Sequence, residues 1–316
     1  MTKLVAVCFL FASLSHACAQ DVDLVQPINS PVILNPAMTG LIPGSYRAVA
    51  VHDQYLYNGS ISAASVDLCL LKDKGYPGDA VGVGVAVSGD RFNHASPRQA
   101  LISVAYHKSI GVKNQHHLSL GIQGAAIWMY NDYYSKNRRF FNYYDANFGL
   151  TYSAILSPKW AAFAGVAIYG ISTPAIEHTI STAQVGSTIS QSRSAHAGAV
   201  FAIDNLTTLY MAACSYQSVI NGDRLLFSSY VGRQLNPGQP IEKKQTTLYA
   251  GLTMRVADLG PYIAIERWNC RLGISYTDRM NDFFDFFPDA GTWAVSLQLF
   301  GATGRRATNW HCPSFY

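Results

Sequence analysis

Residues 80–88, AVGVGVAVS, indicate how this chain folds. Successive side chains of an extended strand point to opposite faces, so the valines share one face and the glycines, alanine and serine share the other. One apolar face and one face of small residues are typical of a barrel strand that separates lipid from a lumen. The valines that we expect to face outward are Val81, Val83 and Val85. We expect Gly82 and Gly84 to face inward.

The same alternation returns along the whole chain, with turn residues between the copies. In residues 247–256, for example, Leu248 and Leu252 share one face and Thr253 lies on the other. Segments of this kind predict strands at 46–58, 60–71, 80–90, 98–110, 117–128, 144–156, 160–170, 195–203, 207–217, 225–233, 247–256, 260–267, 269–277 and 292–300. Because hydrocarbon does not tolerate unpaired backbone groups, such a sheet must close on itself. We therefore predict an all-β fold, a closed antiparallel transmembrane β-barrel of about 14 strands with an irregular N-terminal segment in or across its lumen.

The composition agrees with a membrane barrel. Only 13% of the 316 residues are charged, about half of the roughly 25% usual in soluble domains. After the first residues, no apolar run approaches the roughly 20 residues of a spanning helix. A large soluble all-β protein stays open as the alternative. The formal net charge of +4 is not concentrated in a Lys/Arg cluster, so nucleic acid is not an expected partner.

The N-terminus has the features of an export signal. Lys3 precedes the apolar stretch 4–14, and Ala17-Cys18-Ala19 has the spacing of a cleavage site. Lipidation of Cys18 is the alternative. The expected organisation is a signal peptide at 1–19, a plug or docking segment at 20–44, the barrel at 45–300 and a C-terminal tail at 301–316.

Residues 20–44, QDVDLVQPINSPVILNPAMTGLIPG, differ in character from the strands. Their four prolines prevent a central strand, because proline lacks the backbone donor that a sheet requires. Apolar side chains such as Val32 and Met38 nevertheless need burial. We expect the segment to lie inside the barrel or across its periplasmic mouth, where it closes the pore and presents the protein to partners. The residues that we expect to form this plug or docking element are Ser30, Pro31, Leu34, Asn35, Pro36, Ala37, Thr39 and Gly40.

The N-terminal segment also carries a family resemblance. Ser30-Pro31, Leu34-Asn35-Pro36-Ala37, Thr39-Gly40 and Tyr46-Arg47 resemble the opening of the PorP/SprF family of the type IX secretion system. Tyr249-Ala250-Gly251 with Arg255, the segment LGISYTD at 272–278 and the tail Cys312-Pro313-Ser314-Phe315 resemble later parts of that family. The chain departs from the family pattern at Asp53-Gln54-Tyr55 and at Thr277, which leaves the subfamily open.

The resemblance implies a barrel in the outer membrane of a Gram-negative bacterium that helps to secrete or anchor surface proteins and takes part in gliding motility. The implied partners are outer-membrane lipid, a secreted surface protein with a C-terminal sorting domain, and periplasmic secretion or motility components. Asn35-Pro36-Ala37 also resembles the N-terminal hatch of FadL-type channels, which implies a channel for hydrophobic small molecules instead. A general porin is the third alternative, although its lumen should be charged, whereas the inward faces here carry mainly glycine, serine, threonine and alanine.

Charged residues within the strand patterns are expected to face the lumen, because an arginine on the lipid face costs about 2–4 kcal/mol near the midplane. The lumen-facing candidates are Arg47, Asp67, Asp145, Tyr249 and Arg255, with the arginines paired to the acids. The aromatic residues expected at the membrane interfaces include Trp160, Tyr169, Trp268 and Trp293. Residues 129–142, 171–194 and 278–291 are expected to be external loops, with binding candidates Tyr133, Tyr134, Arg138, Arg139, Phe283 and Phe284.

Patterns for catalysis or metal binding are not found in the sequence. It contains no nucleophile-elbow, zinc-protease or phosphate-loop motif, and the aspartates near residue 285 do not have EF-hand spacing. We therefore expect no enzymatic activity and no cofactor. The cysteines of the mature chain are far apart, and a disulfide between Cys270 and Cys312 is left open.

Overall fold

The structure is a computed structural model of the chain. It describes residues 24, 26, 29–42, 44–55, 59–72, 79–92, 95–111, 115–131, 139–157, 159–172, 175–180, 183–188, 191–203, 208–219, 222–235, 246–255, 258–279 and 291–301. The predicted signal peptide and all of the predicted tail except Gly301 lie outside these residues.

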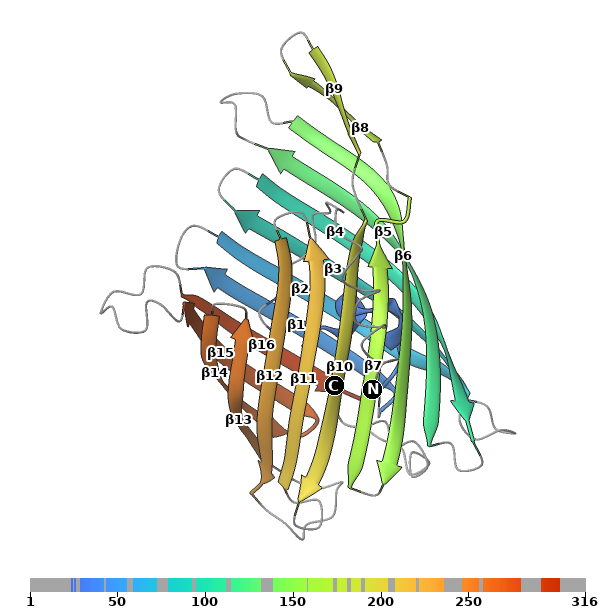
Figure 1. Cartoon of the computed structure of the whole chain (residues 1–316), viewed down its shortest axis with the longest axis vertical. Helices are drawn as coiled ribbons and strands as arrows, with labels where there is room; N and C mark the ends of the chain where they lie inside the picture. Colours follow the sequence, from blue (N-terminus) through green and yellow to red (C-terminus); the bar gives the residue numbers. More distant parts are fainter. Residues whose placement is uncertain are drawn as a thin grey trace, which may run out of the picture.

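Within the described residues, fourteen strands form one closed antiparallel barrel (Figure 1), which confirms the predicted fold class. The barrel strands are β1 (Tyr46–Tyr55), β2 (Gly59–Lys72), β3 (Ala80–Phe92), β4 (Ala95–Ile110), β5 (His116–Asn131), β6 (Arg139–Ser157), β7 (Trp160–Tyr169), β10 (Ser192–Ile203), β11 (Thr208–Val219), β12 (Gly222–Gln234), β13 (Thr246–Arg255), β14 (Asp258–Arg267), β15 (Cys270–Arg279) and β16 (Thr292–Phe300). Strands adjacent in this order pair with one another, and β1 pairs with β16 to close the ring, from Arg47 opposite Phe300 to Tyr55 opposite Thr292.

The alternation of the sequence becomes the two faces of the wall. Val85 is 54% exposed and Leu252 is 53% exposed on the outer side, whereas their neighbours Ala86 and Thr253 are 2% and 0% exposed on the lumen side. Large apolar side chains are exposed on the outer face of almost every strand. A soluble protein rarely exposes so continuous an apolar surface, so the outer face is the surface of a membrane barrel. No helix among the described residues has the length and apolar character needed to cross a membrane.

The strands run further than the sequence predicted at one end of the barrel. β5 continues to Asn131 and β6 begins at Arg139, so half of the external loop expected at 129–142 is paired strand, and Arg139 lies opposite Asn131. Tyrosine and phenylalanine favour extended structure, and an adjacent antiparallel partner lets the pairing continue beyond the lipid. The loop expected at 171–194 contains a second hairpin, β8 (Ala175–Ile180) and β9 (Ala183–Thr188), which stands above the barrel in Figure 1.

The N-terminal segment lies inside the ring of strands, where Figure 1 shows it in blue. It forms a short α-helix, α2 (Pro31–Leu34), and a 3₁₀ turn, η2 (Pro36–Met38). We refer to residues 29–42 as the plug. The end of the barrel where β1 begins is called the turn end, and the end where β1 finishes is called the loop end.

Candidate functional site

The plug fills the lumen at the turn half of the barrel, and every one of its residues is buried. Its prolines shape it. Pro31 occupies the first turn of α2 and Pro36 the first turn of η2, positions where the missing backbone donor is not needed. Asn35 separates the two turns in an extended conformation, and its side chain caps η2 by accepting a hydrogen bond from the Ala37 amide at 2.8 Å.

A row of small residues runs around the lumen at the level of the plug. In strand register its members are Gly82, Ala105, Gly121, Gly149, Ala167 and Ser194, from β3 to β10. A Cβ at Gly121 would overlap the backbone of Pro36 and Ala37, and a Cβ at Gly149 would overlap the Asn35 side chain. The plug therefore rests directly on the backbone of the wall, at positions where only glycine leaves room.

Asn35 attaches the plug to β6 and β7. Its Nδ2 lies 3.1 Å from the Thr151 Oγ1, 3.2 Å from the Leu150 carbonyl oxygen and 3.1 Å from the Val166 carbonyl oxygen. The residue is 0% exposed, so water cannot replace these acceptors while the plug is docked. Loss of a buried donor of this kind leaves its acceptors unsatisfied, at about 1–3 kcal/mol each.

Arg47 and Asp67 face the lumen and hold the opposite side of the plug. Their side chains are both 0% exposed and form an ion pair with 2.7 Å between Nη2 and Oδ2 and 3.0 Å between Nε and Oδ1. The same Nη2 donates to the Met38 carbonyl at 3.2 Å, and Asp67 accepts a hydrogen bond from the Gly40 amide at 2.7 Å. Gly40 has φ +74° and touches the backbone of Gly82, which explains why this position is glycine. The ion pair is therefore a clasp on the plug as well as a cross-strand pair.

The remaining plug residues expected from the sequence are also bound to the lumen. The Thr39 hydroxyl donates to Ser103 Oγ at 2.9 Å, and the Thr39 carbonyl accepts from His107 Nε2 at 2.8 Å. The Ser30 carbonyl accepts the Leu34 amide at 2.9 Å and so begins α2. Each expected plug residue thus lies in the lumen, while its role in docking a partner stays a prediction.

Polar contacts of three wall residues on and beside the plug were not expected from the sequence. Gln123 donates to the Val32 carbonyl at 3.1 Å, and Asn147 donates to Gln123 at 2.9 Å. Tyr169 donates to the Ile33 carbonyl at 3.2 Å and is 8% exposed, so its expected place at the membrane interface is wrong. Its position in the alternation of β7, on the same face as buried Phe163, was the available signal.

Apolar side chains of the wall pack against the plug in two groups. On one side the plug residues Leu34 and Met38 pack with Phe163, Val200, Met211, Tyr230, Tyr249, Tyr262 and Ala264. On the other side a second group, here called the Val49 cluster, contains Leu24, Val32, Ile33, Val49, Val51, Ile61, Ala63, Ala86, Leu101 and Ala125. In register, Val49, Ser65, Ala86, Leu101 and Ala125 form the row next to Arg47 and Asp67 on the side of the loop end.

Tyr249 belongs to a charged cluster at the turn end of the lumen. Arg271 donates to Glu266 Oε2 from Nη2 at 2.7 Å and from Nε at 2.9 Å, and its Nη2 lies 3.1 Å from the Tyr249 hydroxyl. The Arg271 guanidinium also lies over the Tyr249 ring, 4.5 Å from its centroid, a favourable cation–π geometry. This charge is paired within the wall and so does not make an open ionic path.

Two other lumen candidates lie nearer the rims. Asp145 does not pair with an arginine: its Oδ1 accepts the Ser172 hydroxyl at 2.6 Å and the Ser172 amide at 3.1 Å. Its place near the loop end of β6 brings it to the segment that leaves β7. Arg255 is the last residue of β13 and falls on the lumen side of the alternation, half-buried.

Several expected features lie outside the described residues. These are the external-loop candidates Tyr133, Tyr134, Arg138, Phe283 and Phe284, and Cys312, the proposed partner of Cys270. Cys270 carries a free thiol. In the described part of the chain, no group of three His, Cys, Asp or Glu residues is placed to hold a metal ion.

The fold and the site define a class, a membrane barrel whose lumen is occupied by its own N-terminal segment. No family model and no curated protein matches the sequence. In fold the chain is similar to the toluene transporter TodX of Pseudomonas putida, with a TM-score of 0.51, 9% identity, and coverage of 90% of this chain and 98% of that one.

Two further solved structures show the same likeness. A TodX deltaS2S3 mutant, a monoaromatic hydrocarbon channel, gives a TM-score of 0.53 at 9% identity over 85% of this chain and 93% of that one. The monoaromatic hydrocarbon channel CymD gives 0.50 at 8% identity over 91% and 96%. At such identities the likeness shows the fold, and it does not test the resemblance to the PorP/SprF family.

Proposed function

We propose that the protein is a channel for hydrophobic small molecules in the outer membrane of a Gram-negative bacterium, gated by its plug. The observation that carries this proposal is the apolar lining of the β1–β5 side of the lumen, against which the plug packs. Val49, Ala86 and Leu101 of the Val49 cluster are 4%, 2% and 5% exposed and share one row of the inner wall.

An apolar lining selects by solvation. Moving a hydrophobic molecule from water to such a wall costs little free energy. An ion would lose its hydration shell there without gaining a polar group in exchange, which costs much more. Next to this lining, the charge of Arg47 is paired with that of Asp67. The likeness to hydrocarbon channels supports the proposal at the level of architecture.

Narrowing the lumen tests the channel. Ala63→Phe and Ala86→Phe enlarge two buried lumen residues, and Ala146→Phe makes the same change on the exposed outer face. Cells that carry each variant are given N-phenyl-1-naphthylamine, a hydrophobic dye that fluoresces after it enters lipid. We expect the two lumen variants to slow dye uptake several-fold and Ala146→Phe to leave it unchanged. Uptake at the native rate in both lumen variants, with the barrel still folded, would refute the channel.

Deleting residues 20–44 tests the gate. The strands do not include this segment, so the barrel should still insert. We expect higher single-channel conductance in planar bilayers and faster dye uptake than in the native protein. Native conductance after the deletion would show that the plug does not close the lumen.

A second candidate function is that of an accessory barrel in type IX secretion or gliding, which receives or anchors a secreted surface protein. The observation in its favour is that the plug motif that resembles the PorP/SprF family, Ser30 to Gly40, is buried in the lumen and contacts the backbone of the wall. A cross-linked pulldown from native outer membranes separates the two functions. Recovery of periplasmic secretion components or of a C-terminal sorting domain, without dye uptake, would favour the accessory role.

A further inference from the structure

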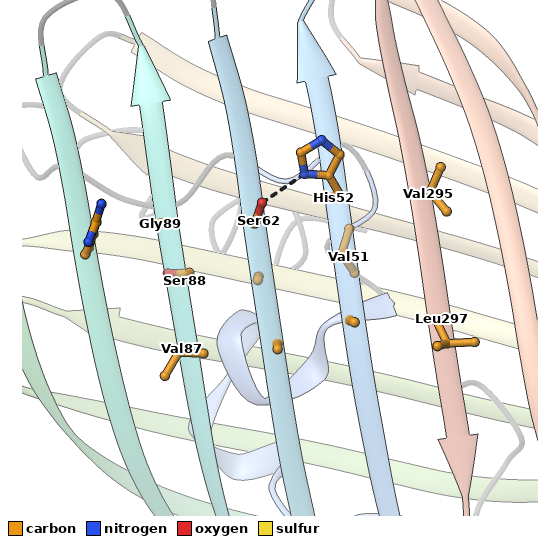
Figure 2. A pocket seen from close by; sticks show the side chains of 12 residues that line it. Val51, His52, Ser62, Val87, Ser88, Gly89, Val295 and Leu297 are labelled. Atoms are coloured by element: carbon orange, nitrogen blue, oxygen red, sulfur yellow. Dashed lines mark hydrogen bonds between the residues drawn. The ribbon is translucent and has the colours of Figure 1, made fainter.

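A shallow groove of about 570 Å³ lies on the outer face of the wall, across β16, β1, β2 and β3 (Figure 2). Its floor is made by Ala50 and Ala64, which lie opposite each other in register. Leu297 flanks Ala50 on one side and Val87 flanks Ala64 on the other. The volume is within the range of about 300–1,000 Å³ found for ligand sites. We call it the β1 groove.

The groove lies where β1 and β2 have small outward residues between the larger Leu297 and Val87. One row nearer the turn end, the outer face carries larger side chains, Val66, Val85 and Ile102, which are 44%, 54% and 65% exposed. The outer face of β1 between Tyr46 and Gln54 carries only alanine and histidine. The depression is therefore a property of the sequence at the seam where the barrel closes.

The end of the groove toward the loop end is polar and basic. The next outward row in register contains Val295, His52, Ser62, Gly89 and Arg98. His52 Nδ1 lies 2.8 Å from Ser62 Oγ, the contact drawn in Figure 2. A Cβ at Gly89 would lie 3.7 Å from Arg98 Cγ. Gly89 and the stem of Arg98 thus lie next to each other at this end of the groove.

One row further toward the loop end, the outward residues mark the membrane interface. This row contains Trp293, Gln54, Ser60 and Arg91 in register. Trp293 is 50% exposed, and outward tryptophan is enriched at the level of the lipid headgroups. In these two rows, the outward residues that the structure describes include two arginines and no carboxylate. Basic side chains at this depth attract anionic headgroups.

We propose that the β1 groove binds one lipid that carries a phosphate headgroup. An acyl chain lies along the floor over Ala50 and Ala64, between Val87 and Leu297. The phosphate lies at the loop end of the groove, where Arg98 is placed to donate charge-assisted hydrogen bonds to it. Charge complementarity identifies the occupant, because an apolar trough that ends in guanidinium groups at headgroup level matches both parts of such a lipid. This site is independent of the proposed channel, since it lies on the opposite side of the wall.

The test uses the full-length protein in non-ionic detergent and two probe lipids, diphosphoryl lipid A and zwitterionic phosphatidylcholine. Native mass spectrometry counts the lipids retained at increasing concentration. Arg98→Gln removes the basic group, and the double variant Ala50→Leu with Ala64→Leu fills the floor. The matched controls are Arg233→Gln and Ala250→Leu, two outward residues on a distant part of the wall.

We expect the native protein to retain one lipid A in preference to phosphatidylcholine. Arg98→Gln should weaken this binding about tenfold or more, as expected for a lost charge-assisted hydrogen bond. The filled floor should weaken binding of both lipids, and the control variants should behave like the native protein. Equal retention of lipid A in all variants, or equal affinity for the two lipids in the native protein, would overturn the proposal. A second protein chain retained in place of lipid would overturn it in favour of a protein docking surface.

Discussion

Replacing Asp67 by asparagine removes the charge that Arg47 depends on, while the size of the side chain stays the same. Both side chains are 0% exposed while the plug is docked, so solvent cannot take over the role of the lost carboxylate. When the plug leaves, water reaches this part of the lumen and hydrates the Arg47 guanidinium. The substitution therefore destabilises the docked state more than the released state, and the equilibrium between docked and released plug should shift toward release.

The size of this shift follows from the burial of the pair. Removing one partner of a buried ion pair typically costs about 3–5 kcal/mol. At about 1.4 kcal/mol per tenfold change, the released population should rise about a hundred- to a few thousand-fold. Arg47→Met with Asp67→Leu should restore part of the docking, because an apolar pair leaves no buried charge. The Gly40 amide still loses its acceptor in that double variant, so full recovery is not expected.

Amide hydrogen exchange at Gly40 and Leu41 measures the release directly, and single-channel conductance in planar bilayers reports whether it opens the lumen. Lys108→Met is the matched control, because it breaks an ion pair with Asp79 whose side chains are 54% and 18% exposed. Such exposed pairs contribute only about 0–1 kcal/mol, so exchange at Gly40 should not change. Native exchange at Gly40 in Asp67→Asn would refute the clasp. Faster exchange without a rise in conductance would refute the plug as the only barrier.

Three further predictions concern the plug and the wall. Gly149→Ala should displace the plug and raise its exchange rate, because the new Cβ overlaps Asn35, whereas Gly124→Ala should be tolerated because its Cβ lies 3.6 Å from Ile102 Cγ2. Asn35→Asp should also weaken the binding of the plug to the wall, by about 1–3 kcal/mol for each acceptor left unsatisfied. Faster amide exchange at Gly40, with the barrel still folded, would measure this loss. Leu252 lies on the outer face. Near the membrane midplane, Leu252→Arg should lower the free energy of unfolding by about 2–4 kcal/mol, measured by urea titration in vesicles. An unchanged free energy of unfolding would place this residue away from lipid.

The alternation of side chains was enough to predict the barrel, because a strand between lipid and lumen leaves its period in every segment. The ends of the strands were harder to predict from the sequence. A strand was expected to begin at residue 98, yet β4 begins at Ala95 and includes Pro97. A proline is tolerated near the start of a strand. Likewise β6 begins at Arg139 and not at residue 144, since pairing outside the membrane depends on the partner strand more than on the local pattern.

The contacts between plug and wall could be predicted only in part. The prolines and apolar residues of 20–44 predicted a buried segment that is not a strand. The cost of a charge on the lipid face predicted that Arg47 and Asp67 face the lumen. The row that contains Gly121 and Gly149 could not be found from one strand, because it depends on the register of several strands around the barrel. A shift of one residue in any of these pairs would turn a glycine outward. The meeting of Asn35 with Gly149 is thus a property of the closed barrel.

The connection between plug and barrel limits how the lumen can open. Gly44 lies against the backbone of Gly301, the Ser45 carbonyl accepts the Cys69 amide at 3.2 Å, and the Tyr46 carbonyl accepts the Gly301 amide at 2.7 Å. The chain is therefore fixed to both neighbouring strands where it enters the wall. Only three residues separate Gly40 from Gly44, where this anchor begins, so a released plug stays close to its site and rebinds at high effective concentration. In the proposed channel, opening would then be a local and reversible departure of the contacts from Asn35 to Gly40, and the barrel need not unfold for the lumen to clear.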